Sequence, residues 1–275
     1  MSATVPSARA WRLSPTGLAM LAVIVFFLLL SVVGPWIVPY PPGQIVSPQI
    51  FGGATAAHPL GTDFLGRDML SRILVGASYS IGVALPATLM ASFAGTSLGL
   101  LAASRRGLLD HLLSRSMDML ITFPSLIFCM VVVAAFGSSV VILVVSAAII
   151  YAPGCYRQMR AIAVDIEATD FVLAARARGE SSVAIMFGEI LPNMWPPLLT
   201  DFGLRFVFIV LLLSGLSFLG LGIQPPLADW GGLVRENIEG LSVGALAVIA
   251  PAVAIAMLTI SVNLLIDSLP RGWRR

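Results

Sequence analysis

Lysine is absent from this sequence, and all 16 basic residues among its 275 are arginines. This excludes a nucleotide-binding P-loop, because that motif needs a lysine to reach the β and γ phosphates of ATP. Any ATP used with this chain must therefore be bound by another subunit. The 14 acidic residues leave a net charge of only +2, which is not the basic footprint of a nucleic-acid-binding protein, so no nucleic acid partner is expected.

Cysteine and histidine are also scarce, with two of each. Cys129 and Cys155 have no metal-like spacing, and in or beside apolar runs a cysteine usually behaves as a small hydrophobic residue. The sequence contains neither an H-E-x-x-H nor a G-x-S-x-G motif, and His58 and His111 lie outside the apolar runs. An intramembrane protease or lipid transferase would need such groups. We therefore expect no catalytic residue, no metal and no cofactor in this chain.

Charge of either sign is rare as well. Charged residues make up 11% of the chain and hydrophobic residues 58%, whereas an ordinary soluble domain carries roughly a quarter charged residues. Crossing a hydrocarbon core of about 30 Å takes about 20 apolar residues in a helix. Six runs near that length predict an all-α integral membrane protein with six transmembrane helices; they cover residues 17–38, 79–103, 117–136, 138–153, 198–222 and 242–266.

The first apolar run follows Arg9 and Arg12, as a secretory signal would. It lacks a convincing A-x-A cleavage site, so an uncleaved first span is the better interpretation. The third and fourth runs are separated only by residues 137–139, which predicts a very tight turn outside the membrane. Arg205 lies inside the fifth run, one helical turn after Asp201, and this spacing predicts an ion pair that offsets part of the cost of burying both charges.

The arginines predict the orientation, because basic residues near span ends are retained on the cytoplasmic side. With both termini inside, the external segments contain only Arg67, Arg72 and Arg235. The cytoplasmic segments then contain Arg9, Arg12, Arg105, Arg106, Arg115, Arg157, Arg160, Arg176, Arg178, Arg271, Arg274 and Arg275. We therefore expect a multi-pass protein of the bacterial cytoplasmic (inner) membrane with both termini in the cytoplasm.

The external segment 39–78 is rich in proline and glycine, which favours turns over regular helix. Within it, His58 is interpreted as a solvated loop residue rather than a metal ligand. Asp63, Arg67 and Asp68 are expected to form a local turn network with charge pairing rather than to bind a substrate. The other external loop covers residues 223–241.

The longest cytoplasmic segment, residues 154–197, contains the most informative pattern, which runs from Asp170 to Asn193 as DFVLAARARGESSVAIMFGEILPN. It predicts two short amphipathic helices with a break between them. Gly179 ends the first helix, and Ser181 or Ser182 caps the second. Pro192 is expected to mark where the second helix gives way to the next span. Taken alone, an amphipathic interfacial helix is the simpler interpretation.

This pattern resembles the EAA loop of binding-protein-dependent ABC importer permeases. The residues that match are Ala174, Ala175, Gly179, Leu191 and Pro192. In that family the loop forms coupling helices that sit in a groove of the cytoplasmic ATPase, and the resemblance implies the same role here. Leu173 stands where the family has the glutamate of its name, and Glu189 stands where relatives often carry a histidine or an apolar residue.

Two more stretches resemble the dipeptide, oligopeptide and nickel group of these permeases. The first is HPLGTDFLGRD at residues 58–68, followed by Leu70, Ser71 and Arg72; the second is LSFLGLG at residues 216–222 with the loop that follows it. With Asn263 to Asp267 in the last span, the likeness covers nearly the whole chain. It is closest to the shorter, C-type permease. Leu213 stands where relatives often have an acidic residue.

The resemblance implies a permease subunit of an ATP-binding cassette importer. Its partners would be a second permease in a heterodimer, two cytoplasmic ATP-binding subunits, an external substrate-binding protein and the lipid bilayer. Residues 1–78 would form the N-terminal tail, first helix and external loop, residues 79–268 the transmembrane permease domain, and residues 269–275 a cytoplasmic tail. Peptides are the favoured cargo, and nickel or another small solute is the alternative.

A stand-alone carrier or channel is a rival class of function. Such proteins usually place ionisable residues within the membrane, whereas the predicted spans are nearly free of charge. This composition favours a subunit whose energy comes from another chain.

Overall fold

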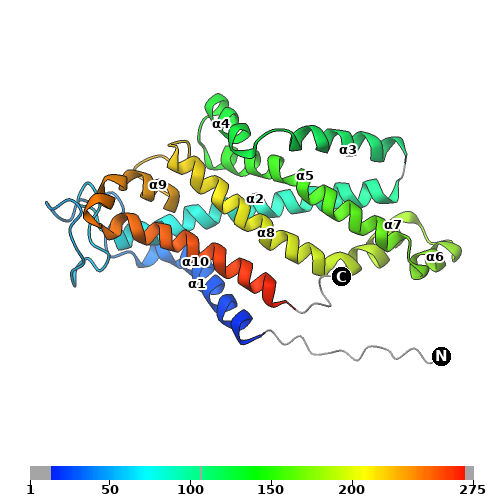
Figure 1. Cartoon of the computed structure of the whole chain (residues 1–275), viewed down its shortest axis with the longest axis horizontal. Coiled ribbons are helices and arrows are strands. Elements are labelled where there is room, and N and C mark those ends of the chain that lie inside the picture. The colour runs from blue at the N-terminus through cyan, green and yellow to red at the C-terminus, as the bar shows by residue number, and fades with distance from the viewer. Residues whose placement is uncertain (1–13, 106, 270–275) are drawn as a thin grey trace.

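The computed structural model describes residues 14–105 and 107–269. The arginines Arg9, Arg12, Arg106, Arg271, Arg274 and Arg275 lie outside these ranges. Within them, the secondary structure is helical apart from two isolated β-bridges. The helices (Figure 1) are α1 (Pro15–Ile37), α2 (Met69–Ser104), α3 (Leu108–Ile121), α4 (Ser125–Phe136), α5 (Val140–Glu167), α6 (Asp170–Ala177), α7 (Ser182–Ile185), α8 (Leu191–Phe218), α9 (Trp230–Glu236) and α10 (Leu246–Ser268). A π-helical turn, Met186–Ile190, joins α7 to α8, and a 3-10 turn, Ile238–Val243, follows α9.

Five helices are long and apolar enough to cross a membrane: α1, α2, α5, α10 and the continuous run Ser182–Phe218. The remaining predicted span, the third along the chain, corresponds to α3 and α4 together. These two helices are bent by 85° relative to one another. A straight helix over residues 117–136 was therefore the wrong expectation. Pro124 explains the break, because a proline disfavours the helical conformation of the residue before it. The Thr122 hydroxyl donates to the Met119 carbonyl at 2.7 Å and closes the end of α3.

Helices α2 and α5 extend at least ten residues beyond their apolar runs. α2 begins at Met69 instead of residue 79, because the Asp68 carboxylate caps it by accepting from the Ser71 amide at 2.8 Å. α5 continues to Glu167 instead of ending at residue 153. Hydropathy records which part of a helix lies in lipid, and polar residues can extend the same helix into water. The predicted turn at residues 137–139 is confirmed, with Ser139 as the N-cap of α5.

Helix α2 lies at the centre of the bundle, and its most extensive packing partner is α5. At their crossing, a Cβ on Gly95 would lie 2.5 Å from the Cys155 Cβ, and one on Gly99 would lie 2.9 Å from the Arg160 amide nitrogen. Only glycine permits this distance between the two backbones. The G-x-x-x-G spacing of Gly95 and Gly99 is a known signature of close helix contact in membranes.

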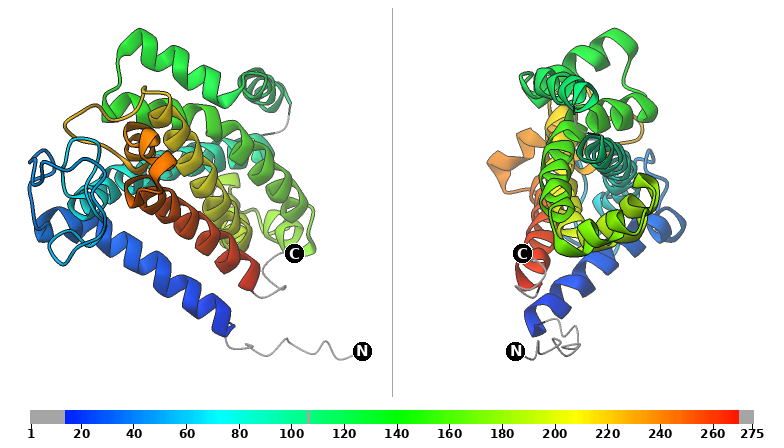
Figure 2. Two further views of the ribbon diagram at one scale, coloured as in Figure 1. Left: turned by 60° about the vertical axis from the view of Figure 1, so that its left-hand side comes forward. Right: turned by 90° about the vertical axis from the view of Figure 1, so that its right-hand side faces the viewer.

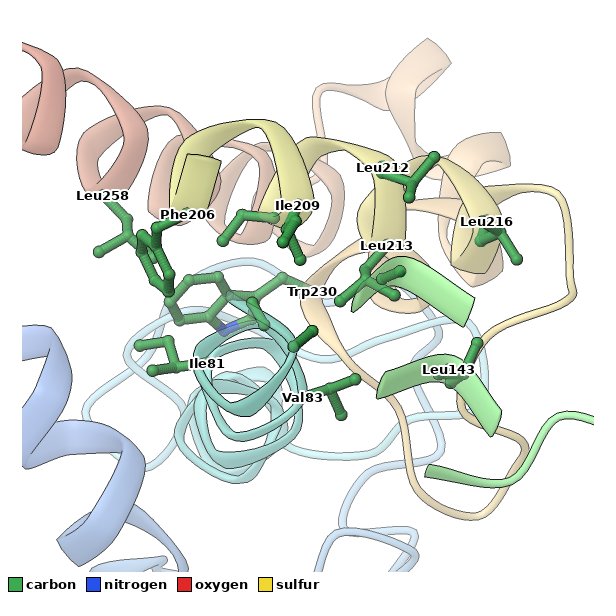
Figure 3. Close-up of a cluster of buried hydrophobic side chains, with 14 of the residues drawn as sticks. Ile81, Val83, Leu143, Phe206, Ile209, Leu212, Leu213, Leu216, Trp230 and Leu258 are labelled. Atoms are coloured by element: carbon green, nitrogen blue, oxygen red, sulfur yellow. The ribbon is translucent and has the colours of Figure 1, made fainter. Parts of the chain in front are cut away.

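Trp230 of α9 fills the part of the core at the α9 end of the bundle, where it packs among side chains of α2, α8 and α10 (Figure 3). It is fully buried, its indole nitrogen donates to the Ile73 carbonyl at 3.1 Å, and its ring meets Phe27 of α1 edge to face. This residue joins the loop between α8 and α10 to the membrane helices.

Helices α1 and α10 run side by side along one edge of the bundle, and α3 and α4 form the opposite edge (Figure 2). Gly34 lets α1 approach α2, since a Cβ there would lie 2.6 Å from the Leu74 carbonyl oxygen. At its other end, α1 meets the end of α10, where Gly17 lies against Ser268. The start of the first helix and the end of the last helix are therefore neighbours.

Candidate functional site

Helices α6 and α7 stand at the end of the bundle far from α9 (Figure 1). Their inward faces join a second core cluster, to which α6 contributes Val172 and Ala175 and α7 contributes Ile185. Met159 of α5 and Met194 of α8 complete its centre, and both are fully buried. The two short helices are thus fixed to the ends of two membrane helices.

The break between α6 and α7 is the one that the sequence predicts. Gly179 has a φ of +80°, its amide donates to the Arg176 carbonyl at 2.9 Å, and the Glu180 amide donates to the Ala175 carbonyl at 3.2 Å. This pair of bonds is a Schellman motif, which favours glycine at the left-handed position. Ser181 then caps α7 by accepting from the Ala184 amide at 3.2 Å.

Ion pairs hold this corner in place. Arg176 of α6 donates to the carboxylate of Glu167, which is the last residue of α5 and is nearly buried. Arg178 and Glu180 pair across the turn at 2.6 Å. The first pair connects α6 directly to the end of a membrane helix, whereas the second is exposed and contributes little to stability.

The outward side of this corner carries large apolar side chains as well as arginines. Its exposed residues include Phe171, Leu173, Ala174 and Val183, with Arg176, Arg178 and Gly179 beside them; we call this surface the docking face. It lies beyond the apolar run of α5. Exposing several large apolar side chains to water there is unfavourable unless another surface covers them. Such a surface is typical of a contact with another protein.

The residues predicted for ATPase coupling divide between the surface and the interior. Ala174 and Gly179 are exposed on the docking face, and Ala175 is fully buried against the membrane helices. Leu191 is half-buried and Pro192 exposed in the first turn of α8.

Pro192 lies where the sequence predicts the change to the next span, in the first turn of α8 directly after the π turn, and the helical run over residues 182–218 continues through it. The π turn that ends at Ile190 explains this, since its wider hydrogen-bond spacing accommodates a proline ring without a break.

At the opposite end of the bundle, Asp63 accepts from Arg67 Nε at 2.6 Å and from Arg72 Nη1 at 2.7 Å, and all three side chains are buried. Glu236 of α9 accepts from the same two arginines at 3.0 and 2.8 Å. The predicted charge pairing of Asp63 and Arg67 is confirmed. No pattern in the sequence predicts that Glu236 joins this cluster, because it lies more than 160 positions along the chain from both arginines.

His58 is not the solvated loop residue that we expected. Its side chain is only 15% exposed, and its Nδ1 lies 2.9 Å from an Asp68 carboxylate oxygen. Asp68 also caps α2 and is itself buried. A buried carboxylate needs several hydrogen-bond partners, and the histidine supplies one of them.

The pair predicted inside the fifth span is present in α8. Arg205 Nε donates to Asp201 at 2.9 Å, and Arg205 Nη1 reaches across to the Tyr151 carbonyl of α5 at 2.7 Å. Gly154 makes room for the guanidinium, because a Cβ there would lie 2.9 Å from Nη1. The charge of Arg205 is therefore neutralised within its own helix, while its remaining bond ties α8 to α5.

Comparison with known proteins fits this geometry. Residues 95–275 match the family described as "Binding-protein-dependent transport system inner membrane component". The chain belongs to this family of ABC importer permeases. It is 33% identical over 259 residues to the di/tripeptide transport system permease protein DppC of Pseudomonas aeruginosa, covering 92% of this chain and 84% of that protein. It is 36% identical over 256 residues to a putative peptide transport system permease of Brucella suis, with the same coverage of each chain.

Two further likenesses agree. The glutathione transport system permease protein GsiD of Pectobacterium atrosepticum is 35% identical over 217 residues, covering 79% of this permease and 72% of that protein. A structure of the MetNI methionine ABC transporter in an inward-facing conformation has the same fold, with a TM-score of 0.62 at 16% identity over 75% of this permease and 96% of that chain. The permease is therefore a multi-pass inner membrane protein that works with separate ATPase subunits.

Proposed function

We propose that this permease is one of two non-identical membrane subunits of an ABC importer for peptides. Two cytoplasmic ATPases would drive the pair of permeases, one of them bound at this docking face, and an external binding protein would deliver the cargo. The observation that carries this proposal is the docking face itself, a surface with large exposed apolar side chains outside the membrane segment that is built on the ends of α5 and α8.

The geometry supports transmission of force from this surface. α6 is held to α5 by the buried Glu167, and α7 continues through the π turn into α8. A partner that moves α6 and α7 would therefore also move two helices that cross the membrane. Leu173 on the docking face is 51% exposed, so at this position the contact with the ATPase would be apolar rather than a salt bridge.

The cargo is inferred from relatives. The similar permeases are named for di- and tripeptides, peptides and glutathione, and glutathione is itself a peptide. These names favour a short peptide over nickel.

The orientation proposed is that both termini are cytoplasmic. Among the described residues, Arg105 caps the end of α2, and Arg176 and Arg178 lie at the end of α6, in keeping with retention of basic residues inside. The contact of Gly17 with Ser268 puts the start of α1 and the end of α10 on one side of the bundle.

The test begins with purification of the tagged permease in mild detergent and identification of its companions by mass spectrometry. We expect a second permease and one or two P-loop ATPases. The complex is then reconstituted in liposomes with its binding protein, and uptake of a radiolabelled tripeptide is measured with ATP and with a non-hydrolysable analogue. ATP-dependent accumulation of the peptide is the expected result.

Two outcomes would contradict the proposal. Recovery of the permease alone, even after crosslinking through a cysteine placed at Leu173, would argue for a self-contained carrier. Accumulation of nickel without accumulation of peptide would support the importer and contradict the proposed peptide cargo.

A further inference from the structure

A cavity of about 650 Å³ lies where the bend between α3 and α4 faces α5 and α8. Its walls include Leu120 and Phe123 at the bend, Tyr151, Arg157 and Gln158 on α5, and Arg205 on α8. The volume is within the range of about 300–1,000 Å³ that is usual for small-molecule sites in proteins. A di- or tripeptide has a matching size.

The cavity lies within the thickness of the membrane. Arg205 precedes Phe218, the last residue of α8, by 13 positions, which is about 20 Å of helix. Tyr151 follows Val140, the first residue of α5, by 11 positions, or about 16 Å. Both residues are therefore well inside a hydrocarbon core of about 30 Å. Arg157 follows Val140 by 17 positions, or about 26 Å, and so lies near the cytoplasmic limit of that core.

The charges in this cavity do not balance. Arg205 is paired with Asp201, and three of its five N–H groups are used by Asp201 and the Tyr151 carbonyl. Arg157 is exposed in the cavity wall, and within the described part of the chain it makes no ion pair or hydrogen bond. One guanidinium charge is thus left unpaired at the cytoplasmic end of the cavity, next to the hydrocarbon core.

An arginine in this position is stabilised when it faces water or binds an anion. Its planar donors fit a carboxylate with two parallel hydrogen bonds. Every free peptide carries one such group at its C-terminus, whatever its sequence. Gln158 adds an amide next to Arg157, and Phe123 and Tyr151 supply aromatic surface for an apolar side chain of the ligand.

We propose that this cavity is a station on the translocation path, where Arg157 binds the C-terminal carboxylate of the passing peptide. The inference rests on the proposed function and adds a residue that determines specificity. It explains how one path can pass peptides of different sequence, because the site binds a charged group that every free peptide has.

The test uses the purified complex of both permeases and ATPases without the binding protein, so that only the membrane path can bind. The probe is a tripeptide with a benzophenone at its amino end, prepared as the free acid and as the C-terminal amide. After irradiation, mass spectrometry locates the labelled segments. We expect the free acid to label residues 120–125 and 150–158, and the amide to label them about tenfold less, which is the effect of one charge-assisted hydrogen bond.

Variants assign the effect to one residue. Arg157→Gln should lower labelling by the free acid to the level of the amide, and Arg157→Lys should restore part of it. Arg115→Gln, at an exposed arginine outside the cavity, should leave the labelling unchanged. Equal labelling by free acid and amide in the unaltered complex would overturn the inference without relying on any variant. Loss of the label on adding phosphatidylglycerol would overturn it too, since the anion bound would then be a lipid phosphate.

These outcomes are separable from failure of the proposed function. If the reconstituted transporter accumulates tripeptide but its cavity is not labelled, only the carboxylate site is wrong. If it accumulates no peptide, the proposed cargo is wrong as well.

Discussion

Gly179 is the residue on which the docking face most depends. Its left-handed backbone ends α6, and no atom outside its neighbouring residues lies within 4 Å of the position that a Cβ would take. A side chain there would therefore clash with nothing inside this chain. It would instead project into the space that a partner must enter, and it would strain the turn.

We predict that Gly179→Leu abolishes ATP-driven uptake while ATP hydrolysis and the amount of permease in the membrane remain near normal. Gly179→Asn is the matched variant, because asparagine adopts the left-handed conformation at low cost. It should keep the turn and still reduce uptake, since its side chain also separates the two surfaces. Both variants are compared by peptide uptake and ATPase rate in liposomes. Normal uptake in the leucine variant would disprove the coupling role.

Asp229 is a buried carboxylate outside the membrane helices, at the N-cap of α9. Burial raises its pKa above the ordinary value of 3.8, and hydrogen bonds from Ser217 and the Gly232 amide offset part of this effect. Above pH 3.8 the folded state thus retains a proton that the unfolded state releases. The stability contributed by this proton is lost as the pH rises through the raised pKa.

Asp229→Asn keeps the neutral form at every pH, and its amide oxygen can still accept from Gly232. We predict that the variant gains stability relative to the unaltered permease as the pH rises from about 4, until the native carboxyl is fully ionised. The measurement is thermal unfolding in detergent with a thiol-reactive dye, because Cys129 and Cys155 are both buried and free. A stability difference that does not vary with pH would contradict this prediction.

At the residue scale, the sequence predicted interactions within one turn of chain and missed those between distant segments. The pair of Asp201 and Arg205 follows from helical spacing alone. Glu236 approaches Asp63 only because α9 folds back onto the start of α2, and Arg157 faces a cavity only because α3 and α4 are bent. No local pattern encodes such contacts.

Among the elements, the crossing of α2 and α5 is a close contact that glycine permits, with a Cβ on Gly95 or Gly99 coming within 3 Å of α5. We predict that Gly99→Leu lowers the free energy of unfolding by at least about 2 kcal/mol, because a side chain cannot be inserted between two packed backbones without moving them. Gly82→Leu is the control in the same helix, where a Cβ meets nothing within 4 Å. Thermal unfolding of the two variants should differ by many degrees, and equal midpoints would disprove the role of this crossing.

The helices were predicted well where the length of the apolar run sets the length of the helix. They were predicted poorly where a helix continues beyond its apolar run. All six apolar runs correspond to helices, including the pair α3 and α4. The ends of α2 and α5 were misplaced by about ten residues or more, because both helices continue beyond their apolar runs. The bend at Pro124 was missed even though proline marks it, since hydropathy is insensitive to direction. The G-x-x-x-G spacing of Gly95 and Gly99 is present in the sequence and is itself a signal of the close contact between α2 and α5.

For the whole molecule, the proposed orientation can be tested with reporters. An alkaline phosphatase domain, which is active only outside the cytoplasm, is fused after Gly240 in one version and after Arg178 in another. We predict high activity for the first fusion and background activity for the second, and the inverse for a green fluorescent protein reporter. The opposite pattern would contradict the orientation predicted from the arginines, and it would place the docking face on the external side.

The unbroken run from Ser182 to Phe218 has 37 residues, so it measures about 55 Å from end to end. A rod of that length pivoting near its middle turns a small push into opposite movements of its ends: a tilt of about 10° would shift each end by about 5 Å. The docking face is at one end of this rod, and the loop that carries Trp230 begins at the other. A movement of the docking face by a partner would thus narrow the path at the cytoplasmic end of α8 and widen it at the other end. Because the helix moves as one body, no chain of side-chain rearrangements between the two ends is needed.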